Sequence, residues 1–469
     1  MASARAGFIL VPLNPNYQAK EMEFCINKAG IKTLICPHQV RKINFYDVLN
    51  EISPNVSQSE PGKLSCKNIP SLKSIINISE DPLRGTFNFK ELLELATTDS
   101  IKRVKDNQHL IQPDDPNNLQ FTSGTTGKPK AALVSHFNVV NNSYDIGKRS
   151  ELDKMHHKIC VQVPFFHAFG IVVVLGSALN FGSTIVIPSP TYNAQSNLQA
   201  IKDERCSILY GTPTMYVDLV NLQKQNPLDL NLKTVVTGGA SCSPDLFKQI
   251  KKHLKVEKVK SIYGLTEATA GTFFSLPIEE DEYKATGTVG YVCDHLEAKV
   301  VGQDNKMVPL GTPGELCIRG YSRMLGYWDD EEQTKNMISQ DGWLKTGDQF
   351  VLQEDGYGRI VGRLKDMIIR GGENIFPKEI EDFLHTHPDI LDVHVIGLSH
   401  ERLGEEVCAC ISLREGATLT HDSLVEFCKG KIAHFKIPSQ LKILDSFPKT
   451  TSGKIQKFLL KEIFENKKN

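Results

Sequence analysis

Short apolar runs rich in β-branched residues alternate along the chain with segments in which apolar residues recur every three or four positions. The short runs end in Gly, Pro, Ser or Thr clusters, as strands do when they run into loops. The predicted strands are "GFILVPL" (7–13), "TLICP" (33–37), "STIVIPSP" (183–190), "CSILYGTP" (206–213) and "LKTVVTGG" (232–239). The predicted helices are "NAQSNLQAIKDERC" (193–206) and "SPDLFKQIKKHL" (243–254). This alternation indicates a chain of the α/β class.

One uncharged segment, "FGIVVVLGSALNFGSTIVI" (169–187), is nearly long enough to span a bilayer. Gly176, Asn180 and Gly182 interrupt it, and Pro188 follows it. The pattern favours a buried helix followed by a core strand over a transmembrane segment.

The pattern changes near residue 286, where short strands follow one another without helices between them. These strands are "TVGYVCDHLEAKVV" (288–301), "GTPGELCIRG" (311–320) and "GRIVG" (358–362), and they predict a small antiparallel, barrel-like part. A new α+β pattern follows, with helices in 377–387 and 422–434 and strands in 392–398 and 406–413. We therefore predict a large domain over 1–362, a hinge at 363–366 and a small, mobile domain over 367–469.

Charge and cysteine content narrow the possible partners. The 469 residues carry a formal net charge of −1 with a pI near 6.9, so neither nucleic acid nor an anionic membrane is an expected partner. The eleven cysteines lack zinc-like spacing, and Cys408 and Cys410 alternate onto one strand face. We expect buried free thiols and a reducing compartment. The pairs His156–His157 and His385–His387 have no third ligand nearby in the sequence and are expected to be solvated.

The stretch "LQFTSGTTGKPKAALVSH" (119–136) combines glycines, hydroxyl side chains and two lysines. Glycines leave backbone N–H groups open, and the hydroxyls and lysines add donors and positive charge, which suits a polyphosphate. It is not a Walker A loop, because only two residues separate Gly124 and Gly127 and Pro129 follows Lys128. On these residues alone, a solvated surface loop is as good an interpretation as a phosphate loop.

Further motifs distinguish these two interpretations. In order, the chain contains "TSGTTGKPK" (122–130), "PFFHAFG" (164–170), "TGGA" (237–240), "YGLTE" (263–267), "TGD" (346–348), "GRLKDMIIRGGENIFPKEIED" (362–382) and "PKTTSGKIQK" (448–457). The set resembles the adenylate-forming superfamily of acyl-CoA synthetases, luciferases and peptide-synthetase adenylation domains. Within it, the chain looks most like mitochondrial medium-chain fatty acyl-CoA synthetases.

The resemblance implies a ligase that uses ATP, Mg²⁺ and coenzyme A to activate a fatty acid, with AMP and pyrophosphate as products. The implied phosphate-binding residues are Thr122, Ser123, Gly124, Thr125, Thr126, Gly127, Lys128, Pro129 and Lys130. The residues implied to hold adenine and ribose are Gly238, Gly239, Ala240, Tyr263, Gly264, Asp348 and Arg363.

The resemblance also implies roles in the two chemical steps. Lys454 is expected to reach the carboxylate and the α-phosphate, and Glu267, beside Thr266, is expected to hold Mg²⁺. His167 is expected to border the acyl pocket, although a core histidine is the alternative. The residues implied for the hinge and the CoA passage are Lys365, Gly371 and Gly372.

The chain departs from the family pattern at two places. Ala131 stands where the family has glycine, and an alanine forced into positive φ there would cost roughly 1 kcal/mol. The motif "AGFILVPLNPNY" lies at the start of this chain, whereas family members reach it after a substantial N-terminal segment. The family resemblance predicts the mitochondrial matrix, and the absence of an Arg- and Ser-rich presequence predicts the cytosol if translation begins here.

Two alternatives stay open at this point. One is an adenylate-forming enzyme with a different carboxylate or acceptor. The other is a non-catalytic relative that binds nucleotide or acyl-adenylate, which the two departures favour and the presence of Glu267, Asp348, Arg363 and Lys454 opposes.

Overall fold

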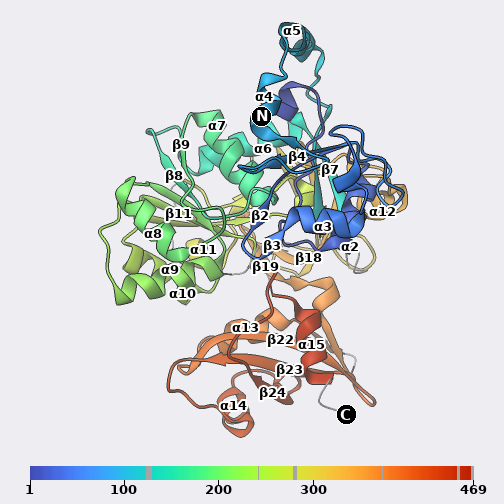
Figure 1. The fold of residues 1–469 in the computed structure, drawn as a ribbon. Helices are drawn as coiled ribbons and strands as arrows, with labels where there is room; N and C mark the ends of the chain where they lie inside the picture. The colour runs from blue at the N-terminus through green and yellow to red at the C-terminus, as the bar shows by residue number, and fades with distance from the viewer. Residues whose placement is uncertain (123–128, 241, 278–281, 372, 451–454, 466–469) are drawn as a thin grey trace.

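The computed structural model describes residues 1–122, 129–240, 242–277, 282–371, 373–450 and 455–465. A large body holds the segments coloured blue to yellow in Figure 1, and a smaller body, orange to red, lies below it. The polypeptide crosses from the large body to the small one after strand β19 (Gly358–Arg363).

A seven-stranded sheet forms the centre of the large body. Its spatial order is β14 (Tyr291–Val292), β13 (Phe273–Phe274), β12 (Lys258–Tyr263), β11 (Thr234–Gly238), β10 (Ile208–Gly211), β8 (Lys158–Val161) and β9 (Thr184–Val186). The strands from β12 to β9 are parallel, and β13 and β14 are antiparallel additions. The strands predicted in 183–190, 206–213 and 232–239 are confirmed in shorter form.

Three helices pack on this sheet: α8 (Ala194–Asp203), α9 (Pro213–Gln225) and α10 (Pro244–Leu254). The α10 helix begins where Ser243 accepts a hydrogen bond from the Leu246 N–H and Pro244 supplies a helical φ. The helices bury Leu198, Leu219 and Ile250 in one core cluster under the sheet. Both predicted helices are confirmed.

The uncharged segment forms a π-helix, η3 (Phe169–Gly176), which continues into α7 (Ser177–Phe181). Gly182 ends the helix at φ +65°, and the chain then enters β9. Val173 and Val174 are buried in the large-body core. Across the described ranges, no helix is long and apolar enough to cross a membrane.

The N-terminal part of the large body has its own small parallel sheet. It consists of β1 (Thr33–Pro37), β4 (Ser74–Ile78) and β5 (Phe87–Asn88), with α2 (Ala19–Ala29) and α3 (Phe45–Ile52) in the same core. Further short elements here are α1 (Ala2–Arg5), β2 (Gln39–Val40), β3 (Ile43–Asn44), α4 (Phe89–Glu94) and α5 (Thr98–Asn107). The predicted strand over 7–13 is wrong: Leu10 makes a single bridge to Asn118, and Pro12 has no N–H with which to extend a ladder.

A three-stranded antiparallel sheet carries the ends of the glycine-rich stretch. Its order is β17 (Gly326–Tyr327), β7 (Lys130–Ser135) and β6 (Pro116–Thr122). Helix α6 (His136–Arg149) follows β7 directly. Ala131 is a buried residue of β7, pairs with Phe121 and has no positive φ, so the strain considered for this alanine does not arise.

Four antiparallel strands form the part predicted as barrel-like, in the order β15 (Leu296–Val301), β16 (Gly314–Gly320), β18 (Leu344–Leu352) and β19. The segment predicted as one strand over 288–301 is divided, because β14 joins the seven-stranded sheet and only β15 belongs here. Helix α12 (Glu331–Met337) lies between β17 and β18 in sequence.

The small body contains one five-stranded sheet with three helices. The strands are β20 (Ile368–Arg370), β21 (Glu373–Ile375), β22 (Ile390–His400), β23 (Gly404–Leu413) and β24 (Gln440–Ile443). The helices are α13 (Pro377–Leu384), α14 (His421–Cys428) and α15 (Lys457–Glu465). Cys408 and Cys410 are fully buried in the same cluster, as their alternation predicts, and the eleven cysteines are free thiols.

The expected solvation of the histidine pairs is wrong for His157. Its Nδ1 lies 3.0 Å from the Ser207 hydroxyl, and its Nε2 lies 3.2 Å from the Glu151 carbonyl oxygen. Burial lowers the pKa of His157, so the neutral ring is a structural link between β8 and its neighbours.

Candidate active site

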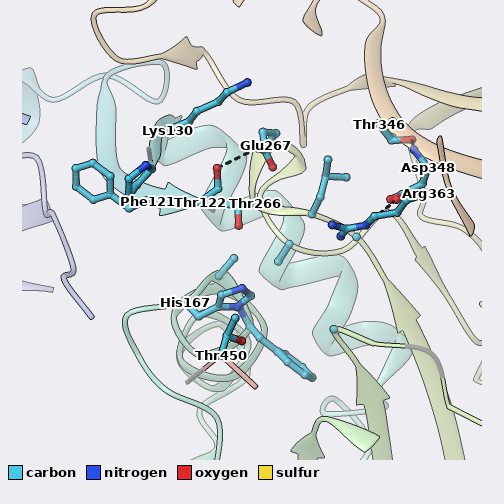
Figure 2. A pocket seen from close by; sticks show the side chains of 18 of the residues that line it. Phe121, Thr122, Lys130, His167, Thr266, Glu267, Thr346, Asp348, Arg363 and Thr450 are labelled. Carbon is cyan, nitrogen blue, oxygen red and sulfur yellow. Dashed lines mark hydrogen bonds and ion pairs between the residues drawn. The ribbon is translucent and has the colours of Figure 1, made fainter. Parts of the chain in front are cut away.

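Two cavities meet between the large body and the small body. The first has a volume of about 940 Å³ and the second about 690 Å³. The residues that line both are Gly239, Ile262, Gly264, Asp348 and Arg363. The two cavities are therefore parts of one long cleft, and Asp348 and Arg363 lie at their junction. Figure 2 shows these two side chains in contact.

The polar end of the first cavity is built where β6, β7 and the loop after β12 come together. The Thr122 hydroxyl donates to Glu267 Oε1 at 3.4 Å, and Tyr327 donates to the same oxygen at 2.8 Å (Figure 2 shows the first contact). Lys130 donates to Gln333 Oε1 at 2.7 Å. Pro129 and Thr266 also line this end. The remaining predicted phosphate-binding residues, 123–128, lie outside the described residues.

Glu267 has the coordination properties of a Mg²⁺ ligand at this end. Its Oε1 is held by two hydroxyl donors, and no contact with another described residue occupies its second oxygen. Among the described residues there is no group of three or more His, Cys, Asp or Glu side chains that could cage a metal. A single carboxylate fits a Mg²⁺ ion held mainly by phosphate oxygens and water, since that ion is commonly bound through one or two carboxylates plus substrate.

Asp348 links β18 to β19 at the junction of the cavities. Its Oδ2 accepts a hydrogen bond from the Tyr263 hydroxyl at 2.7 Å, and its Oδ1 lies 3.2 Å from Arg363 Nε. Burial and the facing carboxylate raise the pKa of Tyr263, so its hydroxyl remains protonated and donates. Both partners hold the buried Asp348 carboxylate in one orientation.

The predicted adenine-binding residues other than Gly238 line the second cavity. Gly239, at φ +79°, Ala240 and Gly264 line the second cavity, with Tyr263 at its wall. The Tyr263 ring itself packs into the large-body core with Phe273 and Phe350.

Gly238 is the last residue of β11 and lines neither of the two cavities among the described residues. A Cβ there would lie 2.6 Å from Ile262 Cγ2 and 2.8 Å from the Ile262 carbonyl oxygen. Packing of β11 against β12 therefore explains this glycine.

His167 and apolar residues from η3 form the other end of the first cavity. Phe169 and Val173 line this end. His167 is half-buried, and its Nδ1 accepts a hydrogen bond from the Phe169 N–H at 3.1 Å. In the neutral ring this contact leaves the proton on Nε2. The structure thus brings His167 to the cavity wall, next to a surface suited to an alkyl chain.

The small body contributes to the first cavity through the chain around its last helix. Thr450 and Gln456, which flank residues 451–454, both line the cavity. Lys454 itself lies outside the described residues, as does Gly372. Lys365 is exposed at the cavity edge in the turn η5 (Leu364–Asp366). Gly371, at φ +61°, lines neither described cavity; its N–H donates to the Leu403 carbonyl at 2.7 Å.

The sequence analysis missed Tyr327 and Gln333, which contact Glu267 and Lys130 directly. Both lie in "GYWDDEEQT" (326–334), a stretch that reads as a strand end followed by a capped helix. Nothing in that pattern marks a functional side chain, because their partners are 60 and 203 residues away in the sequence.

Comparisons with known proteins identify the class. A model of the AMP-binding enzyme family matches residues 1–328, and a model of the AMP-binding enzyme C-terminal domain matches residues 379–454. The chain belongs to the AMP-binding enzyme family, the adenylate-forming enzymes that its motifs resemble.

Individual relatives agree with this class. The chain is 42% identical to the medium-chain acyl-CoA ligase ACSF2, mitochondrial, of Macaca fascicularis, over 100% of this chain and 76% of that protein. It is 37% identical to the putative acyl-CoA synthetase YngI of Bacillus subtilis, over 98% of this chain and 84% of that protein.

Among solved structures, the chain is similar to MatB from Rhodopseudomonas palustris in two states. The ATP-bound structure gives a TM-score of 0.81, and the apo structure gives 0.70. In both cases the identity is 25%, with 99% of this chain and 85% of that chain covered. The arrangement of the whole chain is therefore more like the ATP-bound form.

Proposed function

We propose that this chain is an ATP-dependent acyl-CoA ligase that activates medium-chain fatty acids. The observation that carries the proposal is the single cleft whose first cavity has a polar end with Lys130 and Glu267 and an apolar end at His167, and which continues past Asp348 into the second cavity. Such a cleft can accept a triphosphate, a ribose and an alkyl carboxylate at the same time. The name of the ACSF2 relative supports the medium-chain assignment.

In the first half-reaction, a carboxylate oxygen attacks the α-phosphorus of ATP, and the bond from that phosphorus to pyrophosphate breaks. Two anions approach each other, so stabilisation of negative charge is the main catalytic requirement. We assign this stabilisation to Lys454 and to the described Lys130, with Thr122 and residues 123–128 around the phosphates. Glu267 would hold Mg²⁺, which supplies further positive charge to the phosphate oxygens when bound.

In the second half-reaction, the thiol sulfur of coenzyme A attacks the acyl carbon of the acyl-adenylate, the bond from that carbon to AMP breaks, and the thiol proton is released. We assign Gly371 and Gly372 to the passage of the CoA thiol. Because Gly371 lies outside the described cavities, this step requires the small domain (367–469) to rotate about the hinge at 363–366.

One observation supports this division of the chain, and two support an adenylating arrangement of its domains. The core clusters of the large body contain only residues before 363, and the two core clusters of the small body contain only residues after 366. Thr450 and Gln456, which come before and after residues 451–454 in the sequence, line the first cavity, which fits an adenylating arrangement of the domains. The greater likeness to ATP-bound MatB agrees with that assignment.

The experiment that tests the function measures pyrophosphate release with a series of carboxylates from two to eighteen carbons, with and without CoA. We expect release to be greatest near octanoate, with AMP and acyl-CoA as products in the complete reaction. Formation of ADP and an acyl phosphate would contradict the proposal. If pyrophosphate release were greatest with an aromatic or short acid, the enzyme would be assigned to that carboxylate and not to medium-chain fatty acids.

Asp348 offers a second test, because we assign it to the ribose hydroxyls of ATP. Asp348→Ala should weaken ATP binding by roughly 1–3 kcal/mol, the cost of leaving hydroxyls unpaired in a partly closed site. CoA binding should change much less. Calorimetry with each ligand measures both, with Asp304→Ala as a matched control at an exposed carboxylate. Equal losses for the two ligands would assign Asp348 to the domain interface alone.

We also propose the mitochondrial matrix as the location, because the ACSF2 relative is named mitochondrial. Fractionation of the endogenous protein tests this assignment.

A further inference from the structure

Tyr327 lies between the two charged groups at the polar end of the cleft. Strand β17 pairs antiparallel with β7, so Tyr327 is opposite Ala132 and next to the end of the glycine-rich stretch. Its backbone N–H donates to the Thr334 hydroxyl at 2.9 Å, and the residue is 7% exposed. These contacts from strand, helix and core give the phenol ring a fixed position.

The hydroxyl of this tyrosine forms a hydrogen bond with Glu267. It donates to Glu267 Oε1 at 2.8 Å and lies 3.0 Å from the Met337 sulfur. Burial, and then the Glu267 charge, raise the pKa of Tyr327, so the phenol stays protonated and the proton points to the carboxylate. A hydrogen bond to an ionised acceptor is stronger than one between neutral groups, so it can orient the carboxylate.

The ring of the same tyrosine contacts the ammonium group of Lys130. Lys130 Nζ lies 5.0 Å from the ring centroid, which is within the range of a cation–π contact. The ammonium group also donates to Gln333 Oε1 at 2.7 Å. Among the described contacts, Lys130 and Glu267 do not form an ion pair with each other, although Tyr327 touches both.

We propose that Tyr327 is a positioning residue that keeps Lys130 and Glu267 apart and aims each at a different part of bound nucleotide. Direct pairing of these opposite charges would neutralise both, and neither would then be available to phosphate or to a divalent cation. The hydroxyl orients the carboxylate, and the ring face, together with Gln333, orients the ammonium group. This inference rests on the proposed function, because that function places Mg²⁺ and the triphosphate here.

The two contacts can be separated by substitution. Tyr327→Phe removes only the hydroxyl. It should therefore weaken the orientation of the Glu267 carboxylate and leave the contact between the ring and Lys130 intact. Gln333→Ala removes a hydrogen-bond acceptor of Lys130. It should therefore weaken the orientation of the Lys130 ammonium group and leave the Glu267 carboxylate oriented. Tyr327→Leu removes both contacts of the tyrosine. Tyr144→Phe is the matched control, because this exposed tyrosine stacks on Phe181 and lines neither described cavity.

The readout is binding and does not depend on turnover. Affinity for α,β-methylene-ATP is measured by calorimetry in EDTA, and Mn²⁺ affinity of the nucleotide complex is measured by electron paramagnetic resonance. For Tyr327→Phe we expect metal-free nucleotide affinity within about twofold of wild type and Mn²⁺ affinity about fivefold or more weaker. For Gln333→Ala we expect nucleotide affinity about fivefold weaker with little change in Mn²⁺ affinity. Tyr327→Leu should show both losses.

An unchanged Mn²⁺ affinity in Tyr327→Phe would overturn the proposal, as would equal loss of nucleotide affinity with and without metal. Thermal unfolding checks that each variant is folded; if Tyr327→Leu does not fold, Tyr327→Phe and Gln333→Ala still test the two contacts. Failure of the proposed function would appear separately, as absence of pyrophosphate release by the wild-type chain with every carboxylate.

Discussion

Lys454→Ala should lower acyl-adenylate formation by about 10²–10³ or more, while the variant still converts supplied acyl-adenylate and CoA into acyl-CoA. The first half-reaction brings two anions together, so loss of a positive charge beside the α-phosphate has its full effect there. The second half-reaction attacks an uncharged carbonyl carbon. We also expect the small domain to present a different face, around Gly371, during that step.

The described neighbours of Lys454 support this expectation. Thr450 and Gln456 line the first cavity on both sides of residues 451–454. By contrast, Lys457 is committed to the small body, where it donates to Glu381 Oε1 at 2.8 Å and to the Val395 carbonyl at 3.0 Å.

The measurement is pyrophosphate release for the first half-reaction and acyl-CoA formation from synthetic acyl-adenylate for the second. Lys461→Ala is the matched control, since this lysine lies on α15 and lines neither described cavity. If Lys454→Ala were folded, bound ATP and lost both half-reactions equally, a single arrangement of the domains would serve both steps and the two-pose proposal would be wrong.

Leu364→Pro should have the opposite effect, with adenylation retained and thioester formation reduced by about 100-fold. Leu364 is the first residue of η5, and Arg363 before it is extended at φ −106° and ψ +139°. A proline is tolerated at the first position of a helical turn and requires an extended residue before it, so the described arrangement accepts it. Rotation about the hinge would have to change these torsions, and proline resists that change because its ring fixes φ near about −65°.

The position of the proline matters within the hinge. Proline at Lys365 would disfavour the helical conformation of Leu364 and would strain the described arrangement itself. Leu364→Ala is the control, because it removes the same side chain and leaves the backbone free. Both half-reactions are measured as for Lys454→Ala. Normal thioester formation by Leu364→Pro would show that the domains do not turn at this residue.

The sequence by itself determined which segments form the elements and which class of enzyme they build. The helices of 193–206 and 243–254 and the strands of 206–213 and 232–239 are local patterns, because period, caps and flanking glycines lie within a few residues of each other. Each of the family motifs between 122–130 and 448–457 is likewise a short contiguous stretch of sequence. The strand predicted over 7–13 was wrong because Pro12 cannot donate to a ladder and because this segment forms only one bridge, between Leu10 and Asn118.

Only the tertiary structure decided what the individual side chains of the cleft contact. Gly238 lies under Ile262, the Tyr263 ring is packed in the core with its hydroxyl on Asp348, and Tyr327 joins Glu267 to Lys130. These partners are up to hundreds of residues apart, and they meet because β11 and β12 are parallel neighbours in one sheet and because β17 pairs with β7. A local pattern records the period and the ends of an element, but the contacts between elements depend on strand order and register, which arise only when the whole chain packs.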